Sequence, residues 1–380
     1  MPKILLIFGT RPEAIKMAPV YRILKDSPEF ETLVAVTAQH REMLDQVLKL
    51  FNITPDFDLN LMTPRQTLQD LTSRALLGVS KVLDECQPDL VLVHGDTTTT
   101  FVGALAAFYK KIPVGHVEAG LRTRNKYSPW PEEMNRRLTG VLTDIHFAPT
   151  KTSRENLIKE GVLPENIFVT GNTVIDALYY TVRENYRFAP EIEAILNRPG
   201  RIILMTTHRR ENWGEPLKNI YRGLLKVLEE AADVRVIFPV HKNPVVREAV
   251  KEVIGEHPRV HLVEPLDYEP FANLMARSYL VLTDSGGIQE EAPSLGKPVL
   301  VLRDTTERPE AVEAGTVRLI GSSTGAVYKN LKELLFDEIS YQKMANAVNP
   351  YGDGKASLRI YRALKYYYKI DQLPPEEFSL

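Results

Sequence analysis

The sequence predicts an α/β protein built from two doubly wound, Rossmann-like domains. Short apolar runs recur along the chain, and most lack polar alternation, which is typical of strands buried on both faces. Segments of helical period separate these runs, and this βαβα order implies parallel sheets covered by helices. The chain has 380 residues, and at about 150 residues per domain this length favours two domains.

Twelve apolar runs are the expected strands, six in each half of the chain. In the first half they lie near 3–8, 31–37, 89–94, 113–117, 144–148 and 167–170. In the second half they lie near 201–206, 234–239, 259–263, 279–283, 298–302 and 317–320. Amphipathic segments such as 41–50 and 66–86 are the expected helices between them.

The strand pattern restarts after residues 173–200, which are predicted to form a helix and a connector. We therefore expect a hinge near 171–176. The N-terminal Rossmann-like domain is expected over 1–172 and the C-terminal one over 173–354. The C-terminal helix, in the segment from about 355 to 380, could pack back on either domain.

Composition excludes several classes of protein. The formal charge is -2 and 44% of the residues are hydrophobic, which argues against a disordered chain and against a dedicated nucleic-acid binder. The single cysteine, Cys86, excludes an internal disulfide and a cysteine-based zinc cluster, and its apolar neighbours predict a buried, inert thiol. No apolar run approaches the roughly 20 residues of a membrane span, and the first apolar run is too short for a signal peptide. We expect a cytoplasmic enzyme.

Charged and ionisable groups follow the apolar strands at six points in the two halves. These groups are Gly9-Thr10-Arg11, His94-Gly95-Asp96, Glu118-Ala119-Gly120, Thr207-His208-Arg209, Val240-His241-Lys242 and Asp284-Ser285-Gly286-Gly287. In open α/β sheets, ligands bind beyond the carboxyl ends of the strands. The pattern therefore predicts an active site in a cleft between the two domains.

The segment Ser285-Gly286-Gly287 lies between a strand and a helix. Free N–H groups and the helix dipole at that point would hold an anion, most simply a phosphate, and glycine lets the ligand approach closely. Glu291, one turn into the helix, could reach ribose hydroxyls. The chain has no G-x-x-x-x-G-K-[ST] motif and no G-x-G-x-x-G after its first strand. We therefore expect no P-loop, no NAD and no metal.

Asp96 and Glu118 are candidate acid and base groups, because two carboxylates in one cleft push their pKa values apart. A helix N-cap is the alternative for Asp96, and the Thr97–Thr100 run is predicted to cap a helix. Glu132 and Arg136 are four residues apart on a predicted helix and share one face, so a surface ion pair is the alternative to a role in the site. His208 could supply a proton or bind a leaving phosphate.

The order of these motifs resembles the non-hydrolysing UDP-N-acetylglucosamine 2-epimerases. The resemblance covers nearly the whole chain, from about residue 3 to residue 354. The matching segments are Phe8-Gly9-Thr10-Arg11-Pro12-Glu13, Thr37-Ala38-Gln39-His40, Val93-His94-Gly95-Asp96-Thr97, Gly115-His116-Val117-Glu118-Ala119-Gly120, Pro131-Glu132-Glu133-Met134-Asn135-Arg136, Thr207-His208-Arg209-Arg210-Glu211-Asn212, Asp284-Ser285-Gly286-Gly287-Ile288-Gln289-Glu290-Glu291 and Asn349-Pro350-Tyr351-Gly352-Asp353-Gly354.

The resemblance implies a GT-B fold, with UDP on the C-terminal domain and the sugar facing the N-terminal domain. It implies interconversion of UDP-N-acetylglucosamine and UDP-N-acetylmannosamine without NAD, usually by a homodimer, for cell-envelope polysaccharide synthesis. The implied catalytic residues are Arg11, Lys16, Asp96, Glu118, Glu132 and His208, with Arg136 on the sugar side. The implied UDP-binding residues are Arg11, His208, Phe271, Ser285, Gly286, Gly287, Glu291 and Arg308. A second UDP-N-acetylglucosamine, acting as activator, would bind at Gln39, Glu42, Arg65, Arg209 and His241.

The chemistry that fits these residues begins with loss of UDP. The C2 hydrogen has no neighbouring carbonyl to stabilise a carbanion, whereas positive charge developing at C1 makes this proton labile. The expected intermediate is 2-acetamidoglucal, to which a proton and UDP are then added back. The alternatives are a hydrolysing 2-epimerase, an epimerase of a 2,3-diacetamido UDP-sugar, a GT-B glycosyltransferase with an acceptor pocket, and a non-catalytic UDP-sugar binding module.

Overall fold

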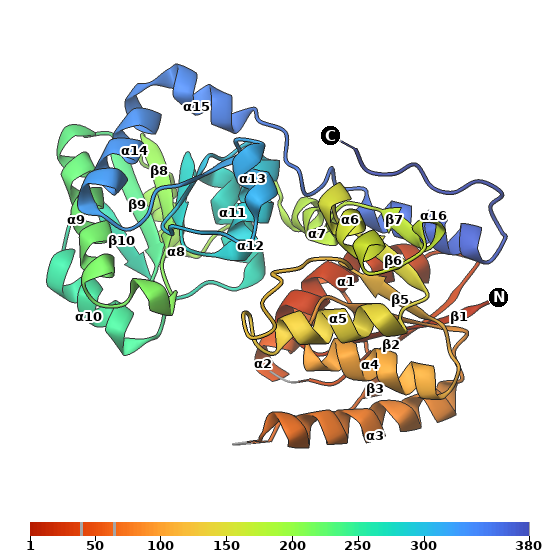
Figure 1. The fold of residues 1–380 in the computed structure, drawn as a ribbon. Coiled ribbons are helices and arrows are strands. Elements are labelled where there is room, and N and C mark those ends of the chain that lie inside the picture. The colour runs from red at the N-terminus through yellow and green to blue at the C-terminus, as the bar shows by residue number, and fades with distance from the viewer. Residues whose placement is uncertain (39–40, 64–65, 380) are drawn as a thin grey trace. The chain divides into compact units, whose positions relative to one another are not determined.

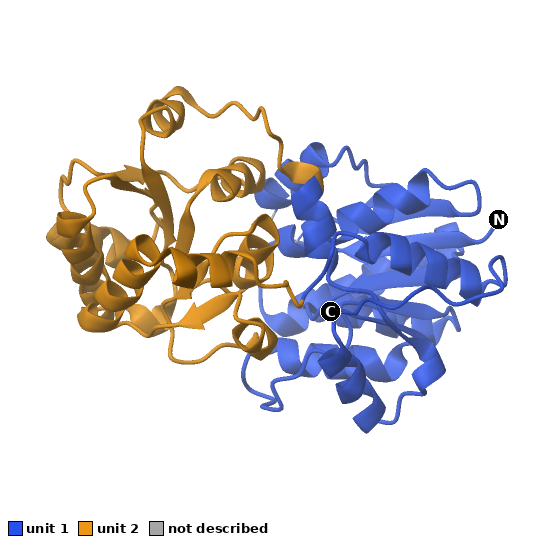
Figure 2. Cartoon of the chain, turned by 90° about the horizontal axis from the view of Figure 1, so that it is seen from above, with its two compact units in different colours: residues 1–179, 351–379 blue, residues 180–350, 380 orange. Residues whose placement is uncertain are grey.

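The computed structural model describes residues 1–38, 41–63 and 66–379. The chain divides into two compact units (Figure 2). Unit 1 contains residues 1–179 and 351–379, and unit 2 contains residues 180–350. Each unit has a parallel sheet with helices on both faces (Figure 1).

The described part of unit 1 contains a seven-stranded parallel sheet in the order β3-β2-β1-β4-β5-β6-β7. Its strands are β1 (Lys3–Phe8), β2 (Glu31–Val36), β3 (Phe57–Asp58), β4 (Leu90–His94), β5 (Val114–Val117), β6 (Ile145–Ala148) and β7 (Ile167–Val169). Ile4, Leu5, Leu6, Ile7 and Phe8 are all fully buried. Successive side chains of a strand point to opposite faces, so helices must cover both faces of β1.

The described helices of unit 1 include the C-terminal one, which packs against α1. They are α1 (Arg11–Lys25), α2 (Arg41–Leu50), α3 (Leu68–Cys86), α4 (Thr98–Tyr109), α5 (Glu132–Leu142), α6 (Lys151–Lys159), α7 (Thr173–Thr181) and α16 (Ala356–Tyr367), with a 3₁₀ turn η1 (Pro164–Asn166). Asp176 in α7 accepts hydrogen bonds from the backbone N–H groups of Ala356 (3.1 Å) and Ser357 (2.8 Å). These bonds cap α16 and keep most of α7 in unit 1, so the division falls at residues 179 and 180 rather than near residue 172.

Unit 2 has a six-stranded parallel sheet in the order β10-β9-β8-β11-β12-β13. Its strands are β8 (Arg201–Thr206), β9 (Val234–Pro239), β10 (Val260–Val263), β11 (Leu280–Thr283), β12 (Val299–Val301) and β13 (Val317–Leu319). Its helices are α8 (Pro190–Leu196), α9 (Glu215–Glu230), α10 (Pro244–Val253), α11 (Tyr268–Arg277), α12 (Gly286–Glu291), α13 (Pro309–Glu313), α14 (Thr324–Phe336) and α15 (Glu338–Ala345), with 3₁₀ turns η2 (Arg210–Asn212) and η3 (Ala292–Leu295). A large apolar cluster joins α9, α10 and α14 to the sheet.

The predicted fold class, two doubly wound parallel sheets, is confirmed. Every expected strand is present, and the helices expected at 41–50 and 66–86 appear as α2 and α3. The two-residue strand β3 was not predicted, because two residues are too short to form a recognisable apolar run. Among the described residues, no helix has both the length and the apolar stretch needed to cross a bilayer.

Candidate active site

The site in unit 1 begins where the strand order reverses. β1 lies between β2 and β4, and chains that leave these strands turn to opposite faces of the sheet. The turns after β1, β4 and β5 therefore meet at one edge. They carry Arg11, Asp96 and Glu118, three of the predicted catalytic residues.

Glu118 and Lys16 form a buried ion pair. The Lys16 ammonium, on α1, contacts Glu118 Oε2, and the two side chains are only 13% and 9% exposed. Asn172 Nδ2 donates to the same oxygen at 2.8 Å, and His94 Nε2 lies 3.8 Å away. A buried carboxylate is costly without such partners, so these contacts hold Glu118 in one orientation.

Asp96 is held by Arg136, the residue expected on the sugar side. Arg136 Nη2 contacts Asp96 Oδ2, and Asn135 Nδ2 donates to the Asp96 carbonyl oxygen at 3.0 Å. The Asp96 side chain keeps 28% exposure, which leaves the carboxylate accessible. Asp96 is not the helix N-cap, because Thr97 Oγ1 accepts the N–H of Thr100 at 3.2 Å and caps α4.

The alternative weighed for Glu132, a surface ion pair with Arg136, is not formed in the structure. Arg136 Nη1 donates instead to Glu133 at 3.0 Å, and Glu133 is fully buried whereas Glu132 is partly exposed at the first residue of α5. Glu133 also accepts the backbone N–H groups of Thr123 at 3.0 Å and Arg124 at 3.2 Å. It therefore ties the loop before α5 to Arg136, a role that the sequence analysis missed.

Glu13 is another buried carboxylate that the sequence analysis did not assign. It accepts the backbone N–H groups of Gly9 (3.1 Å) and Thr10 (2.8 Å) and the hydroxyl of Thr97 (2.7 Å). Burial raises its pKa, although these hydrogen bonds act in the opposite direction. The Thr10-x-x-Glu13 spacing is a capping box and could have identified it. Glu13 joins the turn that carries Arg11 to the turn that follows Asp96.

The turn after β4 rests on a neutral histidine. His116 Nε2, on β5, lies 2.7 Å from the carbonyl oxygen of Gly95. Complete burial lowers the pKa of His116 to about 3. A neutral ring that donates from Nε2 supports Gly95, the residue before Asp96, and adds no charge to the site.

The site in unit 2 is centred on Asp284 at the carboxyl end of β11. β8 and β11 are neighbours where the order of this second sheet reverses. Asp284 is fully buried, and its Oδ1 lies 3.0 Å from His208 Nδ1. Asp284 also accepts the backbone N–H of Arg209 at 3.0 Å and the amide of Asn212 at 3.1 Å. Burial raises the pKa of Asp284, but the contacts with His208 and the backbone N–H groups of His208 and Arg209 together outweigh burial, and the pKa falls below its usual value.

This arrangement orients His208. Its Nδ1 faces the Asp284 carboxylate, so Nε2 points away from it, and the side chain remains 39% exposed. The ring of His241 lies 6.1 Å from that of His208. Burial, followed by the charge of His208, lowers the pKa of His241. Asp284 was named in a motif but not as a site residue. Its function as an orienting group could not be recognised because His208 lies 76 residues earlier.

The predicted phosphate-binding segment begins α12, with Ser285 at its N-cap. Gly287 is exposed, and a Cβ on it would meet no atom within 4 Å, so space beside its backbone is open. A Cβ on Gly286 would lie 3.5 Å from Arg209 Nη2. An anion at this point would meet free N–H groups and one guanidinium.

The other predicted UDP-binding residues of unit 2 lie on or beside the same short helix. Glu291 accepts the hydroxyl of Tyr268 at 2.9 Å, and Arg308 Nε donates to Glu290 at 2.6 Å. Phe271 is half-buried in α11. Two acidic side chains of α12 are thus already held by neighbours, which orients the helix relative to α11.

The residues expected to bind an activator lie in both units. Glu42 is exposed on α2 of unit 1, whereas Arg209 and His241 belong to unit 2. Gln39 and Arg65 lie outside the described residues. The described residues contain no group of three His, Cys, Asp or Glu side chains that could hold a metal ion.

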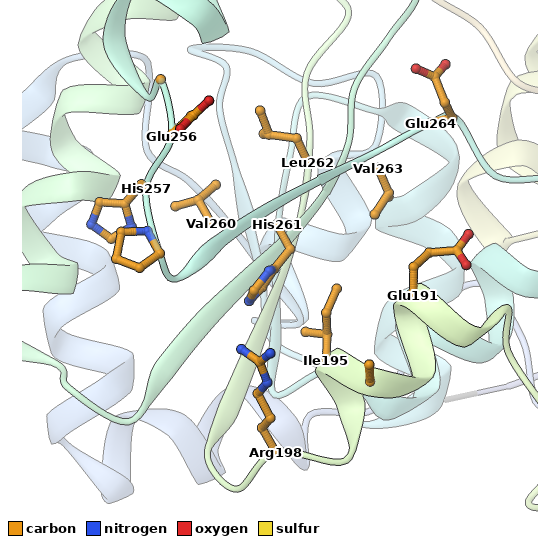
Figure 3. Close-up of a pocket in the computed structure, with 13 residues that line it drawn as sticks. Glu191, Ile195, Arg198, Glu256, His257, Val260, His261, Leu262, Val263 and Glu264 are labelled. Atoms are coloured by element: carbon orange, nitrogen blue, oxygen red, sulfur yellow. The ribbon is translucent and has the colours of Figure 1, made fainter.

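A groove of about 770 Å³ lies elsewhere in unit 2, against the edge strand β10 (Figure 3). Arg198 and His261 point toward one another at its centre, with Glu191 and Glu264 at one end. None of the predicted site residues lines it. We therefore place the candidate active site at the carboxyl ends of the strands and not in this groove.

The comparisons with known proteins agree with one another. The family model described as UDP-N-acetylglucosamine 2-epimerase matches residues 22–365. A UDP-N-acetylglucosamine 2-epimerase of Bacillus subtilis (strain 168) is 56% identical over 99% of this chain and 98% of its own. The crystal structure of the Neisseria meningitidis UDP-GlcNAc 2-epimerase bound to UDP-GlcNAc has a TM-score of 0.85 and 52% identity, covering 95% of this chain and 99% of that one. A Methanocaldococcus jannaschii enzyme in complex with UDP-GlcNAc and UDP has a TM-score of 0.77 and 36% identity over 96% and 99%.

Proposed function

The chain belongs to the UDP-N-acetylglucosamine 2-epimerase family, and from this premise we propose that it interconverts UDP-N-acetylglucosamine and UDP-N-acetylmannosamine. Identity of 56% over 99% of the chain supports the activity. The observation that carries the proposal is the pair of carboxylates, Asp96 and Glu118, at the ends of the neighbouring strands β4 and β5. Each is held by a basic side chain, so each suits proton transfer or the stabilisation of positive charge.

The proposed reaction has two balanced steps. In the first, the C1–O bond breaks with its electron pair on UDP, C2 loses its proton to a base, and a C1–C2 double bond forms. In the second, a proton is added to C2 from the opposite face and UDP returns to C1. No hydride is transferred, so the overall change is an isomerisation. We assign proton transfer at C2 to Asp96, and assign Glu118 and Glu132 to proton transfer and charge stabilisation near C1 and C2.

The leaving diphosphate needs cationic and N–H groups that gain strength as its charge develops. We assign this role to His208 and Arg11, together with the start of α12 at Ser285–Gly287, whereas Lys16 is proposed to act through its ion pair with Glu118. The orientation of His208 by Asp284 supports this assignment, because it directs Nε2 away from the buried carboxylate. Glu291, Arg308 and Phe271 are proposed to bind the remainder of UDP, and Arg136 to serve the sugar through its contact with Asp96.

Proton NMR of UDP-N-acetylglucosamine with the purified protein in D₂O tests the activity, with no NAD added. We expect UDP-N-acetylmannosamine to appear and deuterium to enter C2 of both sugars. Free N-acetylmannosamine with UDP would indicate a hydrolysing enzyme instead. No conversion of bound ligand would refute the proposal and favour the modified-sugar epimerase, the glycosyltransferase or the binding module.

We further propose that a second UDP-N-acetylglucosamine activates the enzyme and that the protein is a homodimer. Glu42 and His241 are exposed and Arg209 is partly exposed, and with Gln39 and Arg65 they make up the set proposed for the activator. A sigmoidal rate curve that becomes hyperbolic in Arg209→Ala would support activation, whereas a hyperbolic curve unchanged by Arg65→Ala would contradict it. Sedimentation of the purified protein tests the dimer. The cytoplasmic location remains a prediction.

A further inference from the structure

Glu118 has an unusual backbone. Its φ of +63 lies in the left-handed region, which a non-glycine residue seldom adopts. Such a conformation persists only when surrounding contacts maintain it, and it is found preferentially at functional sites. The residues that contact Glu118 are therefore candidates for a role in the site.

Asn172, just before α7, provides one of these contacts in a fixed orientation. It is 3% exposed. Its Oδ1 accepts the backbone N–H of Val174 at 3.0 Å, and its carbonyl oxygen accepts that of Ile175 at 3.2 Å, so Asn172 caps α7. Because the capping bond needs the amide oxygen, the amide Nδ2 must face Glu118 Oε2, 2.8 Å away.

The backbone of Asn172 is anchored as well. Its N–H donates to the carbonyl oxygen of Tyr351 at 2.6 Å. Tyr351 is the first residue of unit 1 after the chain returns from unit 2, and it is 2% exposed. The side chain that holds Glu118 is thus joined to two segments that lie far apart in the sequence.

We propose that Asn172 is a positioning residue that holds Glu118 in its reactive orientation by donating a hydrogen bond to Oε2. This inference rests on the proposed function of Glu118. The amide donates without carrying charge, so it orients the carboxylate and leaves the ion pair with Lys16 intact. Asparagine meets both demands at this position, because a cap requires an acceptor and Glu118 requires a donor.

Asn172→Asp keeps the acceptor that caps α7 but replaces the amide donor that faces Glu118. Aspartate caps helices about as well as asparagine, so folding should be preserved. Toward Glu118 the new carboxyl can donate only while it is protonated. Once it ionises, two carboxylates face each other at close range, and like charges of this kind disfavour ionisation of both groups. We therefore expect the activity of Asn172→Asp, relative to the parent protein, to fall as the pH rises.

The other ionisable groups that face Glu118 do not reverse the expected fall of activity with rising pH. Lys16 from α1 and His94 from β4 also face Glu118. Both are basic, and they favour ionisation of the new carboxyl, which shifts the fall toward lower pH. They are present in the parent protein too, so the ratio of the two rates at each pH isolates the effect of the new carboxyl.

The experiment measures kcat and KM of UDP-N-acetylglucosamine epimerisation for both proteins between about pH 5 and about pH 8. We expect kcat of Asn172→Asp to fall by at least about 10-fold relative to the parent at the alkaline end and to recover toward the acidic end. KM should change less than about 3-fold, because Glu118 is assigned to the reacting carbons and not to UDP.

The matched control is Asn243→Asp at the start of α10. Asn243 also caps a helix, accepting the N–H of Val245 at 2.9 Å, so this variant makes the same chemical change at another cap. Its kcat ratio should be independent of pH. A pH-independent ratio for Asn172→Asp, with thermal stability retained, would overturn the proposal. A parent protein that does not epimerise would instead refute the proposed function.

Should Asn172→Asp unfold, Asn172→Ser provides the second test. A serine hydroxyl caps the helix but is too short to reach Glu118. We expect this variant to remain folded and to lose kcat at every pH, without the recovery at acidic pH. Parent-like kcat in a folded Asn172→Ser would contradict the positioning role.

Discussion

Replacing Gly120 with alanine tests how the turn after β5 holds Glu118 in place. Gly120 has a φ of +90, and an L-residue adopts a left-handed conformation at a cost of about 1–2 kcal/mol. A Cβ at this residue would lie 2.3 Å from the carbonyl oxygen of Ser153. That oxygen belongs to the backbone of α6 and cannot rotate away. Overpacking of this kind costs about 1–3 kcal/mol, so the total loss of stability should be about 2–5 kcal/mol.

Gly161→Ala is the matched control for the backbone strain. Gly161 has a φ of +91, and a Cβ on it would meet no atom within 4 Å. This variant should therefore lose only the strain, about 1–2 kcal/mol. For domains of this size 1 kcal/mol shifts Tm by about 2–4 °C, so Gly120→Ala should melt about 2–12 °C below Gly161→Ala.

The assay is thermal unfolding of both variants and the parent, followed by circular dichroism at one scan rate. Epimerase activity is measured in parallel, and Gly120→Ala should lose the larger share because the turn carries Glu118. Equal Tm values for the two variants would refute the reasoning. That result would mean that α6 moves away from the new methyl group at negligible cost.

Three further predictions concern catalysis, nucleotide binding and pH. Asp96→Asn and Glu118→Gln should each lower the epimerisation rate by more than about 100-fold, measured by NMR, and a near parental rate in either variant would contradict its assigned role. Gly287→Ala should leave Tm unchanged because its Cβ meets open space, yet weaken UDP binding by about 10-fold or more in calorimetry; Gly325→Ala, equally open, is the control. Burial lowers the pKa of His116 to about 3 and that of His146 to about 4, from 6.5. Because the unfolded chain then binds protons more readily, the stability of the folded protein should fall as the pH drops below 6.5. The loss should be up to about 1.4 kcal/mol per pH unit for each histidine. His146→Gln should show a shallower loss of Tm between pH 7 and pH 5, and an unchanged slope would argue against this linkage.

The strands are predictable from the sequence because each one is a short run of neighbouring apolar residues. A parallel strand covered on both faces must be apolar at consecutive residues, as β1 and β4 are. The same reasoning locates part of the site. Residues just after such strands lie at the end of the sheet where ligands bind. Asp96 and Glu118 follow the neighbouring strands β4 and β5 of unit 1, and His208 and Ser285 follow the neighbouring strands β8 and β11 of unit 2.

The residues that orient these groups could not be predicted in the same way. Asn172 lies 54 residues from Glu118, and Asp284 lies 76 residues from His208. No periodicity connects positions so far apart, because their contact follows from the order of strands in the sheet. Glu13 is the exception, since its capping box with Thr10 spans three residues.

The pairing of Arg136 illustrates what a helical spacing leaves undecided. Residues three and four apart are both neighbours on a helix, so Glu133 and Glu132 were both available to Arg136. Burial decides between them. The fully buried Glu133 carboxylate needs compensating partners, and it obtains them from Arg136 and from the backbone of the preceding loop. The partly exposed Glu132 can interact with water, so an ion pair with Arg136 would stabilise it little.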